Sequence, residues 1–489
     1  MIYKMNENTV IEVETPFGKT EKTTVGEIVK QGTFLGPTLC CVSTDQVNNI
    51  GESQERSLGK EYIAILIFVD DVMSAGGPED ARKAIRNFKE MEDLKKYTYG
   101  PKKTKYMVLN TGKEKEEAIE EDVSLGRITK TNEYKYVGFH LNESGNCLHH
   151  IEQKTSKIPG QINAIKSIAN FNTVGERFLA VRLQLYESCV LPSMLYGLET
   201  WHQHMKSEIR NLEKMQAKAL HLLLGMPHST PYVGLLSELG IWRMEEMLDY
   251  RRIMLLQNLL QSDDRRLCKR VIINQREDEE EGTFYQTTKE KMDIYKIEAT
   301  QIENMSKNQL KKIIKTEINK KMAGVVNEAS KRMKKMRFTK PETEFKRKDY
   351  LLKMSGSEAL HTLKTRLNML PVHCNFRGDT SLETKCWHCK MEDDSTEHLI
   401  ECEALGPTFL KKEYLVNSSN VELWKLINER TKFNLDNRKK SEVRNEDVQE
   451  VDNINNSVHQ SQPRGRKRKA EEKTMNYNDS ARYQKSIKT

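Results

Sequence analysis

Two adjacent carboxylates follow the most apolar run of the sequence. Residues 62–69 read YIAILIFV, a β-branched stretch with no polar face, and Asp70 and Asp71 come directly after it. Such a run predicts a strand buried on both sides, and two charges at its end need solvent, a cationic partner or metal ions. Carboxylates in this position can hold two Mg²⁺ ions that clamp the attacking hydroxyl and the leaving pyrophosphate of nucleotidyl transfer. The alternative is that the dipeptide only ends the strand in a turn.

A second group of residues has the spacing of a metal site. Cys386 and Cys389 are separated by two residues, and His398 and Cys402 follow on what we expect to be a short helix. Three thiols and one imidazole complete a tetrahedral shell, so the pattern predicts a structural Zn²⁺ site. Two alternatives stay open. His388 competes with His398 for the metal, and the thiols could also be a buried, metal-free cluster.

The elements that must position the acidic pair alternate between strands and helices. Residues 1–36 predict a short β-rich segment, and a helix is expected to begin after Gly36-Pro37. A second helix with an apolar stripe follows residue 78, and further strands are predicted at 106–109 and 134–141. This alternation predicts a sheet domain that ends near residue 145.

From residue 149 onward the apolar spacing becomes helical. Residues 208–224 and 244–260 predict amphipathic helices, and 306–336 predicts a basic helix that opens with the capping box Ser306-x-x-Gln309. The fold class is therefore α+β, with a partial sheet domain, a mostly helical remainder and a small zinc knuckle.

Charge is distributed unevenly along the chain. Residues 306–349 contain 15 Lys and Arg against 5 Asp and Glu, an excess of +10, whereas the whole chain has a net charge of +8. We interpret this stretch as a surface for the RNA or DNA backbone, with a solvated helix face as the equally weighted alternative. The polar tail carries PRGRKRK at 463–469, which is typical of a nuclear localisation signal, with non-specific contact to nucleic acid as the alternative. We therefore expect a nuclear protein.

Composition excludes some classes of protein. Hydrophobic residues make up 37% of the chain and charged residues 31%, with a mean hydropathy of −0.71. Because no apolar run is long enough to span a bilayer, a membrane partner is not expected. Nine Cys without an even framework indicate a reducing compartment.

Four short motifs, taken in order, resemble a known family. They are QGTFLGP at 31–37, FVDD at 68–71, KTKYMV at 103–108 and YKYVG at 134–138. Together they are similar to the later palm motifs of reverse transcriptases from non-long-terminal-repeat retrotransposons. The resemblance continues through YESCVLPSMLYGLETW (186–201), LEKMQAKALHLLLGMPHSTP (212–231) and LLSELGIW (235–242), and it resumes over 358–405 with the Cys/His knuckle.

The resemblance implies a partial palm at 1–145, a helical thumb and connection at 146–262, and a helical region with the zinc knuckle at 351–432. Charge and composition add an acidic linker and basic helical region at 263–350 and a disordered basic tail at 433–489. The implied activity is RNA-directed DNA polymerisation. The implied partners are an RNA template and a DNA primer.

The same resemblance implies catalytic roles. Asp70 would bind the catalytic Mg²⁺ ions, and Asp71 would support it as the second acid. Lys103 would be the cation near the pyrophosphate, with Lys105 as a close rival and a solvated surface lysine as the alternative.

Substrate-binding roles are implied for five further residues. Gln31 and Gly32 would lie near the incoming nucleotide and the template, and Phe68 would form the wall beside the primer terminus. Tyr136 and Gly138 would grip the primer end.

One expected residue is missing from the pattern. The family has another metal-binding Asp on an earlier palm strand, and residues 1–30 contain only Glu as acids, none of them after an apolar strand. Because the metal carboxylates supply positioning and charge neutralisation, we expect that this chain alone does not polymerise DNA. The alternative function is a non-enzymatic nucleic-acid-binding protein derived from such an element.

Overall fold

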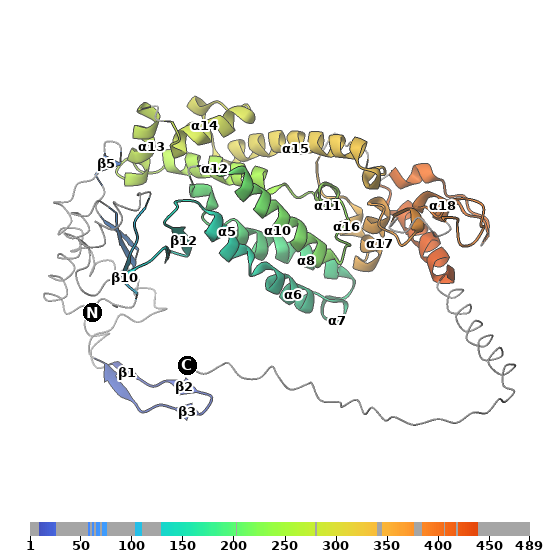
Figure 1. Cartoon of the computed structure of the whole chain (residues 1–489), viewed down its shortest axis with the longest axis horizontal. Coiled ribbons are helices and arrows are strands. Elements are labelled where there is room, and N and C mark those ends of the chain that lie inside the picture. Colours follow the sequence, from blue (N-terminus) through green and yellow to red (C-terminus); the bar gives the residue numbers. More distant parts are fainter. Residues whose placement is uncertain are drawn as a thin grey trace, which may run out of the picture. The chain divides into compact units, whose positions relative to one another are not determined.

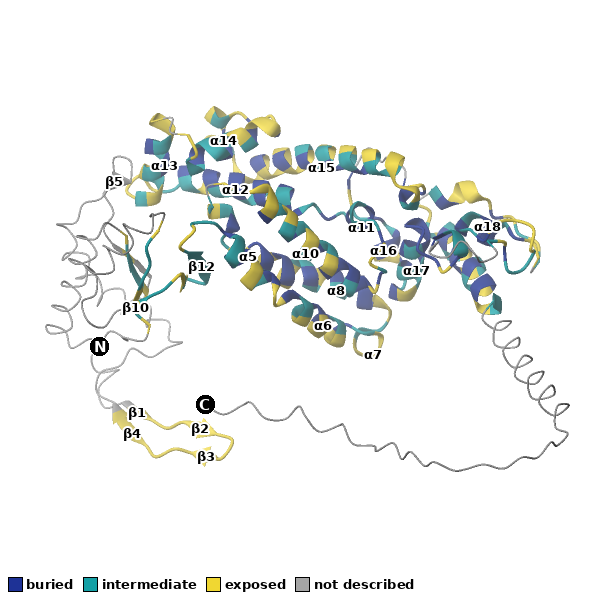
Figure 2. Cartoon of the chain, in the orientation of Figure 1, coloured by how far each residue is buried: buried dark blue, intermediate teal, exposed yellow. Residues whose placement is uncertain are grey.

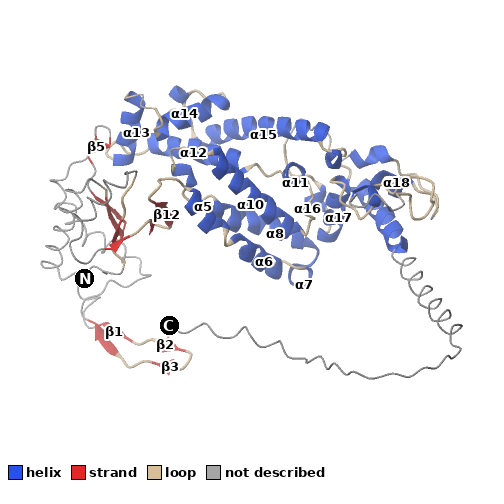
Figure 3. Cartoon of the chain, viewed as in Figure 1, coloured by secondary structure: helices blue, strands red, loops and turns tan. Residues whose placement is uncertain are grey.

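The computed structural model is mostly helical, with a few short strands, as expected for an α+β protein (Figure 3). It divides into two compact units, Met1–Glu429 and Arg430–Thr489. The structure describes residues 9–25, 57–58, 61–62, 65–68, 71–75, 103–109, 129–201, 203–278, 281–339, 345–375, 384–404, 406–416 and 419–438. Gln31, Gly32, Asp70, the helices expected after residues 37 and 78, and the basic cluster at 463–469 lie outside these ranges.

The predicted β-rich start of the chain is confirmed over its described part. Strand β1 (Thr9–Ile11) pairs antiparallel with β4 (Thr23–Val25), and β2 (Glu14–Thr15) pairs with β3 (Gly18–Lys19). Gly18 has a φ of 120°, a conformation that favours glycine, so it suits the turn between β2 and β3. The described residues of this segment are exposed to solvent (Figure 2).

The apolar run before the acidic pair forms two strands instead of one. Strand β6 (Glu61–Tyr62) pairs with β5 (Ser57–Leu58), and β7 (Ile65–Phe68) is a separate strand. Strand β8 (Asp71–Ser74) returns antiparallel to β7, with Phe68 opposite Asp71. The prediction of a strand buried on both sides was wrong, because Leu66 is 41% exposed.

The strand expected at 134–141 is also a hairpin. Strands β11 (Glu133–Tyr136) and β12 (Phe139–Asn142) pair antiparallel. Val137 and Gly138 connect them with φ values of 47° and 80°, and positive φ at both central residues is the mark of a tight hairpin turn. Strand β9 (Lys105–Tyr106) pairs in parallel with β10 (Thr129–Lys130). Among the described residues, every sheet has two strands, so a continuous palm sheet is not observed.

The helical part follows from residue 148 (Figure 1). Its helices are α5 (Leu148–Thr155), α6 (Ile158–Ile168), α7 (Phe171–Val174), α8 (Phe178–Leu185), α9 (Leu191–Met194), α10 (Lys206–Leu224), α11 (Tyr232–Leu239), α12 (Met244–Leu260), α13 (Leu267–Glu277), α14 (Phe284–Ile294), α15 (Lys307–Arg332), α16 (Tyr350–Lys353), α17 (Gly356–Arg366) and α18 (Thr396–Glu401). None of the described helices is long and apolar enough to cross a membrane.

The helix boundaries agree closely with the local sequence signals. Helix α12 has the predicted bounds, and α10 ends as predicted before Gly225, whose φ of 61° closes the helix. The capping box of Ser306 and Gln309 opens α15. Residues 421–438 are helical, so the prediction of disorder from residue 433 was wrong up to residue 438.

Helix α15 shows how the bundle is built. Its buried residues are all apolar, recur every four positions and are at most 4% exposed: Leu310, Ile314, Ile318, Met322 and Val326. This stripe packs against α11 and α12. Trp242 reinforces the packing, because its Nε1 donates a hydrogen bond of 2.9 Å to Asn319 Oδ1. The opposite face of α15 is therefore left to solvent.

A buried ion pair joins α11 to α17. The guanidinium of Arg366 donates two hydrogen bonds to Glu238, of 2.8 and 2.9 Å, and the Tyr350 hydroxyl donates a third of 2.9 Å. The side chains of Arg366 and Glu238 are 1% and 0% exposed. Because each charge is fully desolvated, each depends on the other. The Trp424 ring lies beside the guanidinium, with its centroid at 5.6 Å.

Candidate metal centre

Two elements bring the Cys/His residues together. Cys386 and Cys389 lie on a tight knuckle, in which Lys390 N donates to Cys386 O (3.0 Å) and Lys390 has a φ of 59°. His398 lies on α18, whose first turn is capped by Ser395 Oγ, and Cys402 directly follows that helix. The expected short helix is therefore confirmed and contains His398, whereas Cys402 is the extended residue directly after it.

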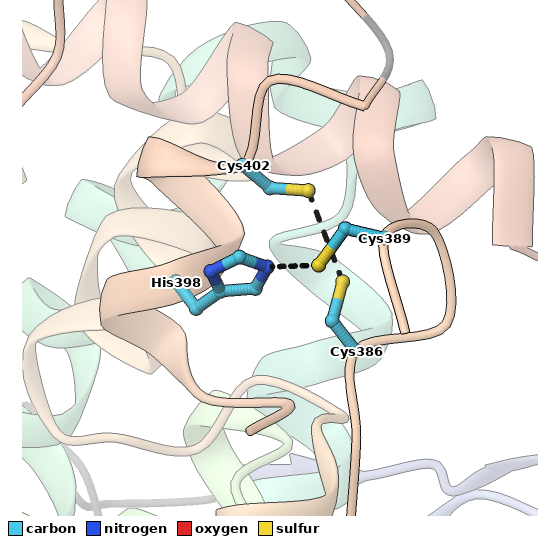
Figure 4. Close-up of side chains that lie close together, drawn as sticks. All are labelled: Cys386, Cys389, His398 and Cys402. Carbon is cyan, nitrogen blue, oxygen red and sulfur yellow. Dashed lines mark hydrogen bonds between the residues drawn. The ribbon is translucent and has the colours of Figure 1, made fainter. Parts of the chain in front are cut away.

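The four side chains converge on one point (Figure 4). Cys386 Sγ lies 3.8 Å from Cys402 Sγ, and Cys389 Sγ lies 3.2 Å from His398 Nε2. Around a tetrahedral Zn²⁺, ordinary bond lengths separate two thiolates by about 3.8 Å and a thiolate from an imidazole nitrogen by about 3.5 Å. The group can therefore hold a metal ion, and its geometry is compatible with Zn²⁺. The metal-ligating group contains His398 and leaves out His388.

Glu392 orients the imidazole. His398 Nδ1 lies 3.1 Å from Glu392 Oε2, and a carboxylate in this position accepts the Nδ1 proton. The lone pair is then on Nε2, the nitrogen that faces Cys389. A carboxylate behind a metal-binding histidine commonly fixes the ring and its tautomer in this way. Sequence reasoning missed Glu392, since an acid six residues before a histidine is not a distinctive signal.

Burial and backbone contacts give the two knuckle thiols different pKa values. Burial raises the pKa of Cys386 to about 12. Burial also acts to raise the pKa of Cys389, but backbone N–H groups of Glu392 and Met391, together with the neighbouring side chains, lower it to about 7. Cys389 is therefore the thiol that most readily supplies the thiolate a metal needs.

The β7–β8 hairpin, which carries Asp71 and is called the acidic hairpin below, lies beside the β11–β12 hairpin. The Tyr136 hydroxyl donates a hydrogen bond of 3.4 Å to Leu66 O, which connects β11 to β7. Burial first, and then the Asp71 carboxylate, raises the pKa of Tyr134 and of Tyr136. Asp71 itself is exposed. The two tyrosines and Asp71 thus share one electrostatic environment.

The remaining predicted site residues are only partly described. Phe68 is the last residue of β7, and Asp70 follows outside the described ranges. Lys103 is exposed, whereas Lys105 Nζ donates to Thr129 Oγ1 across the β9–β10 pair. Gly138 occupies the turn next to Tyr196, which places an added Cβ 3.4 Å from that ring. The structure therefore does not bring Lys103 to the acidic pair through any described contact.

The exposed face of α15 carries lysines at helical spacing. Lys307, Lys311 and Lys315 recur every four residues, and Lys312 lies next to them; all four are exposed. Within the described part of the chain, these four lysines form no ion pair. Farther along the helix, Lys320 pairs with Glu317 instead. The first half of α15 is therefore the more strongly cationic part.

The comparisons with known proteins do not assign a family. No protein-family model matches the sequence, and no significant match is found among curated proteins.

Proposed function

We propose that this chain is the palm-and-thumb portion of an RNA-directed DNA polymerase of the non-long-terminal-repeat retrotransposon type. The observation that carries the proposal is the contact between the FVDD hairpin and the YKYVG hairpin. The hydroxyl of Tyr136, in the YKYVG motif, donates a hydrogen bond to the backbone oxygen of Leu66, which lies 70 positions earlier in the chain and in β7, the strand that ends at Phe68 of FVDD. A polymerase palm requires these two motifs to be close together, so the contact supports the proposal.

The chemistry would rest on the acidic pair. Asp71 is exposed at the start of β8, directly after Asp70, so its carboxylate is accessible to a cation and to a nucleic-acid end. Mg²⁺, when bound there, supplies charge neutralisation for phosphoryl transfer. The turn of the second hairpin, at Val137 and Gly138, is held by the Tyr196 hydroxyl, which donates a hydrogen bond of 2.7 Å to Val137 O. A fixed turn is suited to position a primer end.

Metal binding at the acidic pair is the sharpest test. Binding of Mn²⁺, used as a probe for Mg²⁺, would be followed by electron paramagnetic resonance with an RNA template and a DNA primer present. We expect Asp71→Asn to weaken binding by at least about tenfold, because it removes one of two adjacent ligands. Glu143→Gln, which changes an exposed acid after β12, is the matched control. Equal Mn²⁺ affinity in the parent and Asp71→Asn would refute the proposal.

Primer extension on the same template addresses the reaction itself. The sequence predicts no extension by this chain alone. Extension that is lost in Asp71→Asn would overturn that expectation while supporting the polymerase proposal. Extension that Asp71→Asn leaves unchanged would instead point to a contaminating polymerase.

A second function, nucleic-acid binding without catalysis, is favoured by the face of α15. Among the described residues, the four exposed lysines of its first half form no ion pair, and the helix buries its other face against α11 and α12. A fixed row of like charges repels itself and attracts a polyanion. A phosphate backbone supplies negative charges at regular spacing, so RNA or DNA fits this surface without any base-specific contact.

Salt dependence of binding tests this second function. Affinity for a single-stranded RNA and for a DNA duplex would be measured between about 50 and 200 mM salt, a range over which phosphate contacts weaken strongly. The slope of log affinity against log salt concentration reports the number of phosphate contacts. Replacing Lys311 and Lys315 by Gln should reduce the size of this slope by about one unit for each phosphate that the lysines no longer bind. Lys157→Gln, directly before α6, is the control. A slope that the double variant leaves unchanged would rule out this face.

We also propose that the Cys/His group binds a structural Zn²⁺. Four protein ligands fill a tetrahedral shell and leave no position for a substrate. The support is the convergence of all four ligands and the carboxylate behind His398. Zinc content should fall by one ion per chain in Cys389→Ser, while Cys268→Ser, which changes an exposed thiol, should retain the full content. Full zinc in Cys389→Ser would refute the site.

A further inference from the structure

A second set of metal-ligating side chains meets where the β11–β12 hairpin joins the helices. Cys147 directly precedes α5, His204 lies two residues before α10, and Glu208 lies in the first turn of α10. Their ligand atoms all lie within 4.8 Å of one another. Cys147 Sγ is 3.3 Å from His204 Nδ1, and that nitrogen is 3.7 Å from Glu208 Oε2.

The histidine is oriented as a ligand. His204 Nε2 lies 2.9 Å from Leu198 O, and a carbonyl oxygen only accepts, so Nε2 carries the proton. In the neutral ring the lone pair is then on Nδ1, which faces Cys147 and Glu208. A backbone carbonyl behind a metal-binding histidine is a common arrangement.

The carboxylate is held in place from behind. Glu208 Oε1 accepts a hydrogen bond from Cys147 N (3.1 Å), and Oε2 accepts one from Met205 N (2.8 Å). Each oxygen retains a further lone pair. These two bonds fix Glu208, but neither donor carries a formal positive charge that would balance its negative charge.

Burial makes that charge costly. Cys147 is 0% exposed and Glu208 is 1% exposed, while the His204 side chain is 11% exposed. Within the described ranges, the one ion-pair partner of Glu208 is His204, and no Lys or Arg pairs with it. A cation nearby would reduce the cost of burying this carboxylate.

We propose that Cys147, His204 and Glu208 bind a second Zn²⁺, separate from the knuckle. A thiolate and a carboxylate together balance the charge of the divalent ion, and the imidazole is neutral. Tetrahedral Zn²⁺ separates sulfur from nitrogen by about 3.5 Å and nitrogen from oxygen by about 3.4 Å, close to the separations found here. The fourth ligand would be water.

The position of the site indicates its role. Cys147 follows the hairpin that carries Tyr136 and Gly138, and α10 belongs to the bundle core. A metal bond between these elements fixes the hairpin to the helices. Phe139 already contributes to this junction by stacking on His150, with ring centroids at 3.9 Å. The ion would make the attachment dependent on metal.

Zinc stoichiometry of the full chain tests the proposal. Purified protein, dialysed against metal-free buffer and measured by mass spectrometry, should hold two Zn²⁺ per chain. Cys147→Ser, which keeps a hydroxyl donor for His204, should hold one. Cys189→Ser, on an exposed thiol of the same region, should hold two. Cys389→Ser should also hold one, and Cys147→Ser together with Cys389→Ser none.

Two results would overturn the proposal. One is a parent protein with a single Zn²⁺ that Cys389→Ser removes. The other is a Cys147→Ser protein that retains both ions. If Cys147→Ser does not fold, His204→Gln provides the same readout at a partly exposed position. Replacement of Zn²⁺ by Co²⁺ gives an independent measure. The two sites together contain four thiolates, three in the knuckle and Cys147, so the sulfur-to-metal absorption of His204→Gln should be about one quarter lower than that of the parent.

Discussion

Removing one partner of the Glu238–Arg366 pair should destabilise the helical unit strongly. In Arg366→Met the carboxylate of Glu238, which is 0% exposed, loses both guanidinium hydrogen bonds and keeps only that of Tyr350. Breaking a buried pair in this way costs about 3–5 kcal/mol, because one charge stays buried without compensation. Methionine fills most of the space of the arginine stem, so a cavity adds little to this cost.

The paired substitution separates charge from packing. In the double variant Glu238→Gln and Arg366→Met, no charge remains buried, and the amide of Gln still accepts from Tyr350. The losses of unfolding free energy in the two single variants can be added to predict the loss in the double variant. We expect the measured loss to be smaller than this sum by about 2–3 kcal/mol. Arg265→Met is the control, since Arg265 is 90% exposed in its pair with Asp263, and we expect no measurable change there.

Native-state hydrogen exchange followed by mass spectrometry is the suitable assay, because it resolves α11 and α17 separately. A loss of about 3–5 kcal/mol corresponds to roughly two to three and a half orders of magnitude in protection of these helices. Urea unfolding followed by circular dichroism gives the global value. The reasoning fails if Arg366→Met changes protection less than about tenfold, or if the two substitutions act additively.

Three further predictions concern individual positions. Burial lowers the pKa of His150 to about 4 from 6.5, so the unfolded chain binds a proton before the folded chain does. The contribution of His150 to the free energy of unfolding should therefore be fully present above pH 6.5 and fall by roughly 3 kcal/mol as the pH drops through 4. Urea titrations at several pH values should find this dependence reduced in His150→Gln. Gly240→Ala should destabilise α11 by about 2 kcal/mol or more in the same titrations, because φ is 63° and the added Cβ would collide with Arg347 N. If the knuckle binds Zn²⁺, loss of that ion in Cys389→Ser should raise hydrogen exchange at Cys402, whose amide bonds to His398 O (2.7 Å), and leave α12 (Met244–Leu260) protected. Equal loosening of both would show that the knuckle also stabilises the bundle.

Local signals predict local structure well in this chain. The capping box of Ser306 and Gln309 and the helix-ending Gly225 act within one turn of the chain, so the sequence alone contains the necessary contacts. The Cys/His knuckle is predictable for the same reason. Its four Cys and His residues lie within 17 consecutive residues, at a spacing that suits the coordination geometry of Zn²⁺.

Strand geometry is less predictable. Val137 occupies a turn at φ 47°, and a β-branched residue normally argues against such a conformation, so the sequence favours one strand over YKYVGFHL. Surrounding contacts override the local preference. The Tyr196 hydroxyl binds Val137 O from 59 residues away, and no periodicity of the hairpin itself reveals that. The apolar run before Asp70 and Asp71 misleads in a similar way, because its composition predicts burial that the short β7–β8 hairpin does not provide at Leu66.

Contacts across long separations leave no sequence signal at all. Glu238 and Arg366 are 128 positions apart, and Cys147 and His204 are 57 apart. Each residue, taken alone, resembles many others on a helix surface. Only the packing of α10, α11 and α17 into one core makes them partners.

That shared core also bears on which function the chain performs. The hydrophobic cluster runs from Cys147 to Ile427, across the predicted boundaries at 262 and 350. The cationic face of α15 is thus held by the bundle and does not depend on the acidic hairpin around Asp71. Binding to nucleic acid through Lys311 and Lys315 should consequently persist in Asp71→Asn at full affinity. If affinity fell together with Mn²⁺ binding, the hairpin and the lysines would contact the same nucleic acid, as a polymerase requires.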